Sequence, residues 1–584
     1  MERLTELRMN TIRVSCVVGI AALIVGGVAG GVRGKNQSKS SARRGETMTG
    51  RVVSSDGRPV FGAIVSARKV GARAFEVRRT GADDKGQFRL DGLRPGAYDV
   101  QAEAPGYAFD DSTADRRYYR AGDSVMLTML KGGVITGSVT NEFGSPVIAV
   151  SVTAIRVRDE EGRPVRGSAM ADTDDRGLYR IYGLLPGSYV VAANHGRFRP
   201  SPAYKNMAPT YHPSATRDTA AVVRVSAGLE VGGIDIRFLG EHGHTISGRL
   251  TGDVSPLIHH VTLTHVASGS VAAATYSGTR EGGAFSFSGV PDGEYTVTAE
   301  RRGVGNDVGA RSGARRVTVK GADVTGLELS LGPLGSLAGK VVLEEAGDEP
   351  VQKNKCQGDS PSAPGETVIV ARRDTTDDKA EGPFMLGSPL DTAPSDDGEF
   401  FVGNLEPGLY HLDVRLRNEG WYTRAITRSL SSKSSIDIGT SGILIRSGER
   451  AAGVTVTIAR GAAVLTGRVL ATRQSALETL RVHLVPSEPE HRDSALRFFE
   501  ARVQDDGSFS LSNIAPGRYW LVARVASRDP SSEAYLPPEA WDASKRARLW
   551  GDGKARGIGV ELQPCQQVSD YKLRHVGSRR SAPR

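Results

Sequence analysis

The chain has 584 residues, of which 71 are glycine and three are cysteine, and its formal net charge is +9. This length predicts several domains, and three cysteines are too few for a small disulfide-stabilised fold. The excess positive charge lies in residues 1–50 and 563–584, whereas residues 51–562 contain equal numbers of acidic and basic side chains. Because a nucleic-acid-binding protein concentrates basic charge on a folded domain, this distribution argues against nucleic acid as a partner.

Residues 14–32 form 19 mostly apolar positions without a charge, and residues 34–47 that follow are a polar linker. The length is typical of a transmembrane helix, whereas the small residues Val28-Ala29-Gly30 are typical of a signal-peptide cleavage region. We expect an uncleaved single-pass membrane anchor, with secretion after signal cleavage as the alternative. Cys16 lies in this segment, and we expect Cys356 and Cys565 to be unpaired thiols, with a disulfide between them as the alternative if repeats four and five fold back on each other.

The rest of the chain is organised around a phrase that occurs five times. Each copy has a turn glycine, an aromatic residue two positions later, a proline-containing turn and a tyrosine. The repeated positions are Gly86, Pro95 and Tyr98; Gly177, Pro186 and Tyr189; Pro291 and Tyr295; Gly398, Pro407 and Tyr410; and Gly507, Pro516 and Tyr519. In the third copy, the pair Gly282-Gly283 leaves the turn glycine ambiguous. Such repetition within one chain indicates repeated structural domains.

The phrase predicts two consecutive β-strands. Asp-Gly turns the chain through φ > 0, which glycine adopts without steric cost. Phe88 and Leu90 then alternate with polar residues, and Tyr98 and Val100 do the same after the Pro-Gly turn. The tyrosine after this turn is similar to the tyrosine corner of β-sandwiches, in which the hydroxyl bonds back to the turn backbone. Each copy is therefore predicted to be a hairpin with one apolar face.

The first repeat carries a longer ordered set of motifs. Gly50-x-Val52 is followed by Gly57-x-Pro59-Val60, Gly62-Ala63-x-Val65, the repeated phrase and Pro105-Gly106-Tyr107. This order resembles the carboxypeptidase regulatory-like domain, strongly in the first two repeats, fairly in the fifth and more weakly in the third and fourth. The resemblance implies a seven-stranded, transthyretin-like (prealbumin-like) Greek-key β-sandwich, a type also grouped with carbohydrate-binding-like folds. We therefore predict an all-β chain of five tandem sandwiches behind one N-terminal helix.

The domain boundaries follow from the repeats. An N-terminal region (1–47) precedes the sandwiches, and a basic tail (563–584), which we expect to be loose, follows them. The second sandwich has a Pro- and Tyr-rich insertion from Arg197 to Asp218, and the fourth has one near residues 344–364. The fifth contains a short helix from Pro538 to Leu549. The five sandwiches are expected at 48–131, 132–240, 241–332, 333–460 and 461–562.

Catalytic motifs are missing from the sequence. A zinc peptidase needs a His-x-x-Glu pair and a distant histidine, and none of the 11 histidines is followed by glutamate three residues later. Five histidines gather in the third repeat, and we interpret them as solvated loop residues. We therefore predict a protein without catalytic residues, metal or cofactor. The histidine group comprises His242, His244, His259, His260 and His265.

Aromatic residues in loops and insertions are the candidates for ligand binding, because loops on a rigid sandwich commonly carry recognition. They can stack on sugars or hold a protein partner, and packing in a core or between domains is the alternative. The sequence thus predicts an exported, membrane-tethered rod of sandwiches that binds a glycan or an envelope protein, or spaces other components. The alternative is an accessory region of an envelope hydrolase, or an enzyme with its site in the insertions of repeats two or four. The main candidates are Tyr204, Tyr211, Trp421, Tyr422 and Trp541.

Overall fold

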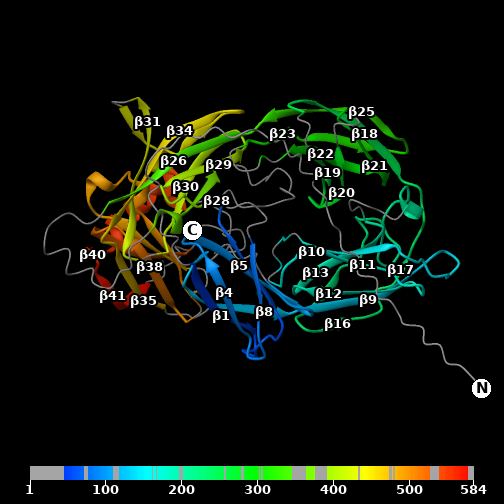
Figure 1. Ribbon diagram of the computed structural model, residues 1–584, viewed down its shortest axis with the longest axis horizontal. Helices are drawn as coiled ribbons and strands as arrows, with labels where there is room; N and C mark the ends of the chain where they lie inside the picture. The colour runs from blue at the N-terminus through cyan, green and yellow to red at the C-terminus, as the bar shows by residue number, and fades with distance from the viewer. Residues whose placement is uncertain are drawn as a thin grey trace, which may run out of the picture. The chain divides into compact units, whose positions relative to one another are not determined.

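The computed structural model describes residues 45–575 with internal gaps (Figure 1). The predicted membrane segment 14–32, the insertion at 345–362 and Cys356 lie outside the described residues. Within the described residues, no helix is long and apolar enough to cross a membrane. The gaps are residues 72–76, 110–117, 161, 163, 166, 196–201, 255–257, 278–281, 302, 304–306, 345–362, 375–390, 418, 432–433, 472–476, 478–479, 505 and 526–537.

The chain forms five β-sandwiches, numbered 1 to 5 in chain order, with one strand pattern. In each, the first strand (A) pairs antiparallel with the strand before the proline turn (D) and parallel with the last strand (G). The second sheet contains strands B, C and F and the strand that carries the repeated tyrosine (E). The predicted all-β fold of tandem seven-stranded sandwiches is therefore confirmed.

Sandwiches 1 and 2 follow this pattern with small additions. Sandwich 1 contains β1 (Glu46–Ser54, A), β2 (Ile64–Lys69, B), β3 (Val77–Gly81, C), β4 (Gln87–Leu93, D), β5 (Ala97–Glu103, E), β6 (Tyr107–Ala108), β7 (Tyr118–Arg120, F) and β8 (Ser124–Lys131, G). Sandwich 2 contains β9 (Gly133–Thr140, A), β10 (Ser151–Arg158, B), β11 (Ser168–Asp172, C), β12 (Leu178–Leu184, D), β13 (Gly187–Ala193, E), η1 (Pro202–Tyr204), β14 (Thr210–Tyr211), β15 (Val223–Val225, F), and β16 (Glu230–Val231) and β17 (Ile236–Arg237), which share the place of G.

In sandwich 3, β23 pairs with both β22 and β25 and so joins the two sheets. Its elements are β18 (His244–Gly252, A), β19 (His259–His265, B), β20 (Val271–Ser277, C), β21 (Ala284–Val290, D), β22 (Gly293–Arg301, E), β23 (Ala310–Ser312), β24 (Arg315–Val319, F) and β25 (Val324–Pro333, G).

Sandwich 4 has a hairpin, β31 and β32, added beyond strand G, and sandwich 5 has an added helix, α3. Sandwich 4 contains β26 (Gly335–Glu344, A), η3 (Pro364–Glu366), β27 (Val368–Arg373, B), β28 (Asp391–Thr392, C), β29 (Glu399–Leu405, D), β30 (Gly408–Arg415, E), β31 (Trp421–Ser431), β32 (Ser434–Asp437), α2 (Ile438–Ser441), β33 (Ile443–Ile445, F) and β34 (Arg450–Arg460, G). Sandwich 5 contains β35 (Ala463–Ala471, A), β36 (Leu480–Pro486, B), η5 (Pro489–His491), η6 (Ala495–Arg497), β37 (Phe499–Arg502, C), β38 (Ser508–Ile514, D), β39 (Gly517–Val525, E), η8 (Glu539–Trp541), α3 (Ala543–Arg556), β40 (Ile558–Leu562, F) and β41 (Gln567–His575, G).

Each sandwich has its own apolar core between its two sheets. A glycine in strand A recurs at this core because the aromatic ring of strand D packs directly over it. A β-carbon on Gly50 would lie 2.1 Å from the carbonyl oxygen of Val125 and 2.5 Å from the ring of Phe88. The equivalent glycines, Gly137, Gly248, Gly339 and Gly467, are equally confined by the carbonyl of strand G.

The turn glycine and the repeated tyrosine have the same roles in each repeat. Gly86, Gly177, Gly398 and Gly507 all have positive φ, and each accepts a hydrogen bond from a strand A amide through its carbonyl. In sandwich 3 that carbonyl belongs to Gly283, which accepts from Leu250 at 2.9 Å and resolves the ambiguity of the sequence.

Four of the tyrosine hydroxyls donate to the carbonyl oxygen four residues earlier, the bond expected of a tyrosine corner. They belong to Tyr98, Tyr189, Tyr295 and Tyr519, at 2.6–3.0 Å. The fifth, Tyr410, is 1% exposed, and burial raises its pKa to about 12. In four of the five sandwiches, the repeated tyrosine therefore ties the proline turn to the core beneath it.

Three expectations need correction. Residues 567–575, predicted to belong to a loose tail, form β41, which pairs in parallel with β35 and completes sandwich 5. Helix α3 (Ala543–Arg556) lies later in the chain than the predicted Pro538 to Leu549: the side chain of Asp542 caps its start, and its last turn holds the basic residues Lys554 and Arg556. Cys565 is disulfide-bonded, so the prediction that it is unpaired was wrong.

Sandwiches that are not consecutive in the chain also contact one another. A simple rod would allow contacts between consecutive sandwiches only. The hydroxyl of Tyr118 in sandwich 1 donates to the carboxylate of Asp391 in sandwich 4 at 2.6 Å. An apolar cluster of Val70, Ala97 and Val368 accompanies this bond. The tyrosine is therefore a packing residue between sandwiches.

Candidate interaction sites

The aromatic candidates for ligand binding are mostly engaged in packing. Trp421 and Tyr211 are only 1% and 5% exposed. Trp541 is half-buried and stacks on His411 of sandwich 4, with ring centroids 5.0 Å apart. Tyr204 and Tyr422 are also half-buried, and the hydroxyl of Tyr204 donates to the carbonyl of Ile148.

The insertion of sandwich 2 is fastened to its own sandwich. The side-chain amide of Asn194 donates to the carbonyls of Tyr204 and Met207 at 2.9 and 2.7 Å. The described part of this insertion therefore covers the sandwich and turns its tyrosine rings inward. Trp421 and Tyr211 are buried and Trp541 is stacked on His411, and ligand binding by all five candidates stays a prediction.

The histidine group of sandwich 3 is divided between strands. His259 and His260 lie on β19 and are 1% and 7% exposed, so the prediction of solvated loop residues was wrong for them. His244 lies on β18, 3.3 Å from a carboxylate oxygen of Asp292. Across the described residues, no group of histidine, cysteine, aspartate and glutamate is arranged to hold a metal ion.

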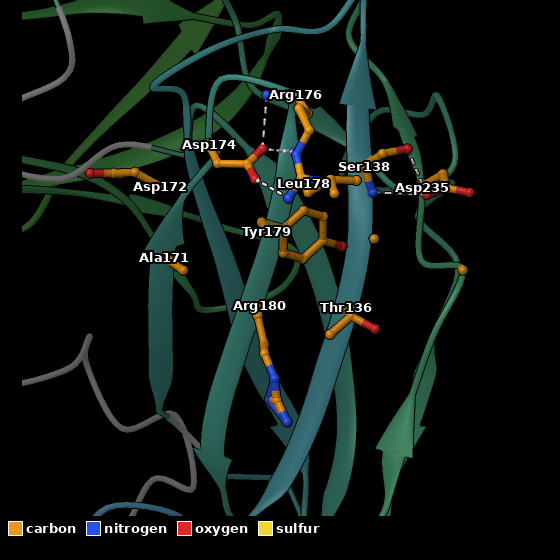
Figure 2. Close-up of a pocket in the computed structure, with 12 residues that line it drawn as sticks. Thr136, Ser138, Ala171, Asp172, Asp174, Arg176, Leu178, Tyr179, Arg180 and Asp235 are labelled. Atoms are coloured by element: carbon orange, nitrogen blue, oxygen red, sulfur yellow. Dashed lines mark hydrogen bonds and ion pairs between the residues drawn. The ribbon is translucent and has the colours of Figure 1, made fainter.

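An open depression of about 520 Å³ lies beside strands A and D of sandwich 2 (Figure 2). Asp174 at its rim accepts hydrogen bonds from the backbone amides of Arg176 and Leu178, and these bonds lower its pKa. Asp235 accepts from the amide and hydroxyl of Ser138, both at 2.8 Å. Figure 2 shows both carboxylates turned toward these partners, so they serve the turn and the strand pairing.

A depression of about 760 Å³ lies at the equivalent place in sandwich 3, beside Gly248, Phe285 and Gly326. The two depressions share the strand A glycine and the aromatic residue of strand D in their linings. Both therefore follow from the common fold of the two sandwiches.

The most regular contacts in the chain are four joints between consecutive sandwiches. At each one, the backbone amide five residues before the strand A glycine donates to a carbonyl in the loop after strand E of the preceding sandwich. The lengths are 2.9–3.0 Å at every joint. The donor and acceptor pairs are Gly132 to Gly106, Gly243 to Asn206, Leu334 to Gly309 and Ala462 to Gly420.

A second residue at each joint comes from strand D. It lies just before the Leu, Val or Ile that precedes the proline turn, and its φ is between 55° and 73° in all five sandwiches. In sandwich 3, a β-carbon on this residue would lie 2.5 Å from the carbonyl oxygen of Met207 in sandwich 2. We call it the joint residue: Gly92, Gly183, Gly289, Asn404 and Asn513.

The two asparagines add side-chain bonds to the joint. The side-chain oxygen of Asn404 accepts from the amides of Gly303 and Gly309 at 3.1 and 2.8 Å, and both amides belong to sandwich 3. The side-chain nitrogen of Asn513 donates to the carbonyl of Trp421 in sandwich 4 at 2.7 Å. Sequence reasoning missed these residues, although the restriction to glycine and asparagine, which tolerate positive φ, was visible in the repeats.

Sandwich 5 has a polar layer that sequence reasoning did not anticipate. Helix α3 and η8 pack over the outer face of strands B and E, where Val485, Ala540 and Leu549 form a small apolar cluster. His483 beneath them is 4% exposed, with Glu500 at 3.8 Å.

We expect His483 to make sandwich 5 sensitive to acid. Burial lowers its pKa from 6.5 to about 4, and the nearby Arg481 and Arg524 act in the same direction against Glu539 and Asp552. Below pH 6.5 His483 binds a proton in the unfolded chain, whereas in the folded state it stays neutral down to about pH 4. The free energy of unfolding of sandwich 5 is therefore unaffected by this histidine above pH 6.5 and decreases as the pH falls from 6.5 toward 4. The loss should approach about 3 kcal/mol.

The measurement is urea unfolding of sandwich 5, followed by tryptophan fluorescence at pH 7 and 4.5. The difference in the free energy of unfolding between the two pH values should be smaller for His483→Gln than for the wild type. An equal difference would contradict the expectation.

Five sandwiches, each with its own core and joined by one repeated contact, define the chain as a tandem β-sandwich protein. Residues 47–115 match the family model of the carboxypeptidase regulatory-like domain. This match identifies sandwich 1 as a domain of that type and agrees with the resemblance seen in its motifs. No curated protein is detectably similar in sequence.

The comparison with solved structures matches parts of this chain to several bacterial proteins. The Bacillus anthracis TIE protein is 14% identical over 49% of this chain and 51% of its own, with a TM-score of 0.13. GBS52, the minor pilin of Streptococcus agalactiae, is 13% identical over 33% of this chain and 94% of its own, with a TM-score of 0.18. BcpA, the major pilin subunit of Bacillus cereus, is 10% identical over 49% of this chain and 99% of its own, with a TM-score of 0.14. This chain spans about half the length of the first of these, and similarities this low support no functional conclusion.

Proposed function

We propose that this protein is a non-catalytic scaffold of the cell envelope, anchored by residues 14–32, with its five sandwiches outside the cytoplasm. The observation that carries the proposal is the set of four equivalent joints. Positions that recur in each repeat fix one sandwich to the next, and Trp421 and Tyr211 are used for packing. A chain built in this way fixes each sandwich to the next, which is what a scaffold requires.

Binding of a glycan or an envelope protein is the finer part of the proposal. It is supported by the regulatory-like domain type and by the half-exposed rings of Tyr204 and Tyr422. The alternative, an enzyme with its site in the insertions, is less well supported, because the described part of the sandwich 2 insertion is packed onto its own sandwich.

The scaffold role predicts that a joint can be weakened without unfolding a sandwich. Asn404→Gly keeps the positive φ but removes the acceptor for the amides of Gly303 and Gly309. We expect hydrogen exchange at these amides to accelerate by about tenfold or more, since leaving a buried or half-buried amide unpaired costs about 1–3 kcal/mol. Exchange in the cores of sandwiches 3 and 4 should stay unchanged.

Unchanged exchange at Gly303 and Gly309 would mean that the joint does not hold the sandwiches together, and the scaffold proposal would fail. The envelope location is tested separately. Protease added to intact cells should cleave the sandwiches but leave the N-terminal segment in the membrane fraction. Protection of all sandwiches would place them inside the cell.

A further inference from the structure

Two buried histidines from different sandwiches lie against one segment, residues 539–556, which contains η8 and α3. His411 belongs to β30 of sandwich 4 and His483 to β36 of sandwich 5, and each is 4% exposed. We call this segment the strap, because it packs over the outer face of sandwich 5 and also contacts sandwich 4 through Trp541. The strap therefore depends on a buried histidine in each of the two sandwiches.

The contact of the strap with sandwich 4 is a stack of two rings. The imidazole of His411 and the indole of Trp541 have centroids 5.0 Å apart and planes inclined by 15°. The Nδ1 atom of His411 is buried and has no hydrogen-bond partner in the described part of the chain. A protonated ring carries a hydrogen on this atom, so it would leave a buried, charged donor unpaired, which is costly. The stack thus requires a neutral His411.

The strap links this stack to sandwich 5. The guanidinium of Arg546, on α3, donates to the carbonyl of Ala540 at 2.6 Å and to that of Trp541 at 3.4 Å. Arg524, on β39, forms ion pairs with carboxylates of η8 and α3 at 3.6 and 3.3 Å. The position of Trp541 on sandwich 4 therefore depends on the packing of α3 on sandwich 5.

Burial favours the neutral form of both histidines. It lowers the pKa of His411, with Arg546 acting in the same direction and Asp374 against it. It also lowers the pKa of His483 to about 4, and charged groups face this ring from each element packed around it. These groups are Arg481 on the same strand, Glu500 on β37, Arg524 on β39, Glu539 on η8 and Asp552 on α3.

We propose that the strap is an acid-sensitive switch, which separates from sandwich 4 and from the outer face of sandwich 5 when His411 and His483 are protonated. A released strap exposes both rings to water, where histidine binds a proton below about pH 6.5. The packed form is therefore fully stable above this pH and loses stability as the pH falls toward 4. The joint bond from Ala462 to Gly420 connects two backbone groups and should stay closed.

Hydrogen exchange of the full-length chain in detergent tests the switch. It is measured by mass spectrometry at pH 7 and 5 and corrected for the intrinsic pH dependence of exchange. We expect the protection of residues 539–556 to fall by about tenfold or more at pH 5. The core strands β35 and β38 and the amide of Ala462 should keep their protection, since only the strap is released.

Glutamine variants identify the groups responsible. His411→Gln and His483→Gln each retain a polar side chain that stays neutral at both pH values. The loss of protection at pH 5 should be smaller in each variant and smallest in the double variant. His491→Gln is the control, because this histidine lies in sandwich 5 outside the strap and its side chain is 34% exposed. It should respond like the wild type.

Three outcomes would overturn the inference. These are equal protection of the wild-type strap at pH 7 and 5, simultaneous loss of protection in β35 and β38, and an undiminished response in the double variant. The inference goes beyond the scaffold role, because it makes one contact between sandwiches 4 and 5 depend on pH. The exchange of Asn404→Gly reads the joint between sandwiches 3 and 4, so the two proposals can fail independently.

Discussion

Replacement of Gly50 by alanine is expected to destabilise sandwich 1 by about 2–3 kcal/mol, because overpacking a closely packed core costs about that much. The added methyl group would meet the carbonyl oxygen of Val125 at 2.1 Å and the ring of Phe88 at 2.5 Å. The ring fills the core and the carbonyl belongs to the pairing of β1 with β8, so neither can move away without a further loss. Strand A and strand G should separate locally.

Gly81 provides the matched control in the same sandwich. It lies at the end of β3, an edge strand, and a β-carbon there would have no atom within 4 Å. Hydrogen exchange measured by mass spectrometry on the whole chain should show faster exchange in β1, β4 and β8 for Gly50→Ala. It should show no change for Gly81→Ala. Equal exchange in the two variants would mean that the packing of Phe88 over strand A does not require a glycine at position 50.

The parts of the fold that could be predicted from the sequence are those with local causes. Glycine at φ > 0, a proline turn and an alternating strand all act within a few residues, so the hairpin around Gly86 and Tyr98 was visible in the pattern. Five copies of the pattern then gave the number of sandwiches. The parallel pairing of strand A with strand G joins residues far apart in the sequence, so no local pattern predicted it.

Strand β41 was missed because its alternation is interrupted. A bulge displaces the register between Leu465 and Gly467, and Asp570 opposite it adopts a φ of 58°. The equivalent bulge in sandwich 4 has Gly453 with positive φ, which is easier to recognise in a sequence. The apolar residues Val568 and Leu573 therefore do not keep a period of two, although both pack at the core.

The burial of the aromatic candidates could not be predicted, because composition does not tell which side of a strand faces the core. Trp421 begins β31 after a short loop, and in the sequence it resembles an exposed loop residue as much as a core residue. The joints were missed for a related reason. Asn404 and Asn513 have local roles as bulge residues, and only the neighbouring sandwich reveals the bonds of their side chains.

Truncation of Trp421 to alanine should therefore have a core effect, with a loss of about 3–5 kcal/mol from sandwich 4. Its ring is the largest fully buried side chain of the chain's described residues and packs in one cluster with Ile426 and Ile458. Trp421→Phe should cost less, because most of the ring volume is retained. The measurement is urea unfolding of the whole chain, with hydrogen exchange assigning the loss to sandwich 4.

The same variant also separates the two interpretations of this residue. The backbone carbonyl of Trp421 accepts a bond from Asn513, so collapse of the emptied core should also increase exchange at the joint with sandwich 5. Tyr422→Ala, at the adjacent half-buried residue, removes a ring without emptying the core and should cost about 1 kcal/mol. If Trp421→Ala kept its stability but lost binding to a glycan or protein, the ring would be a recognition residue. If Trp421→Ala instead lost several kcal/mol more than Tyr422→Ala and exchanged faster at the joint, Trp421 would be shown to close the core of sandwich 4. The same result would show that it supports the joint with sandwich 5.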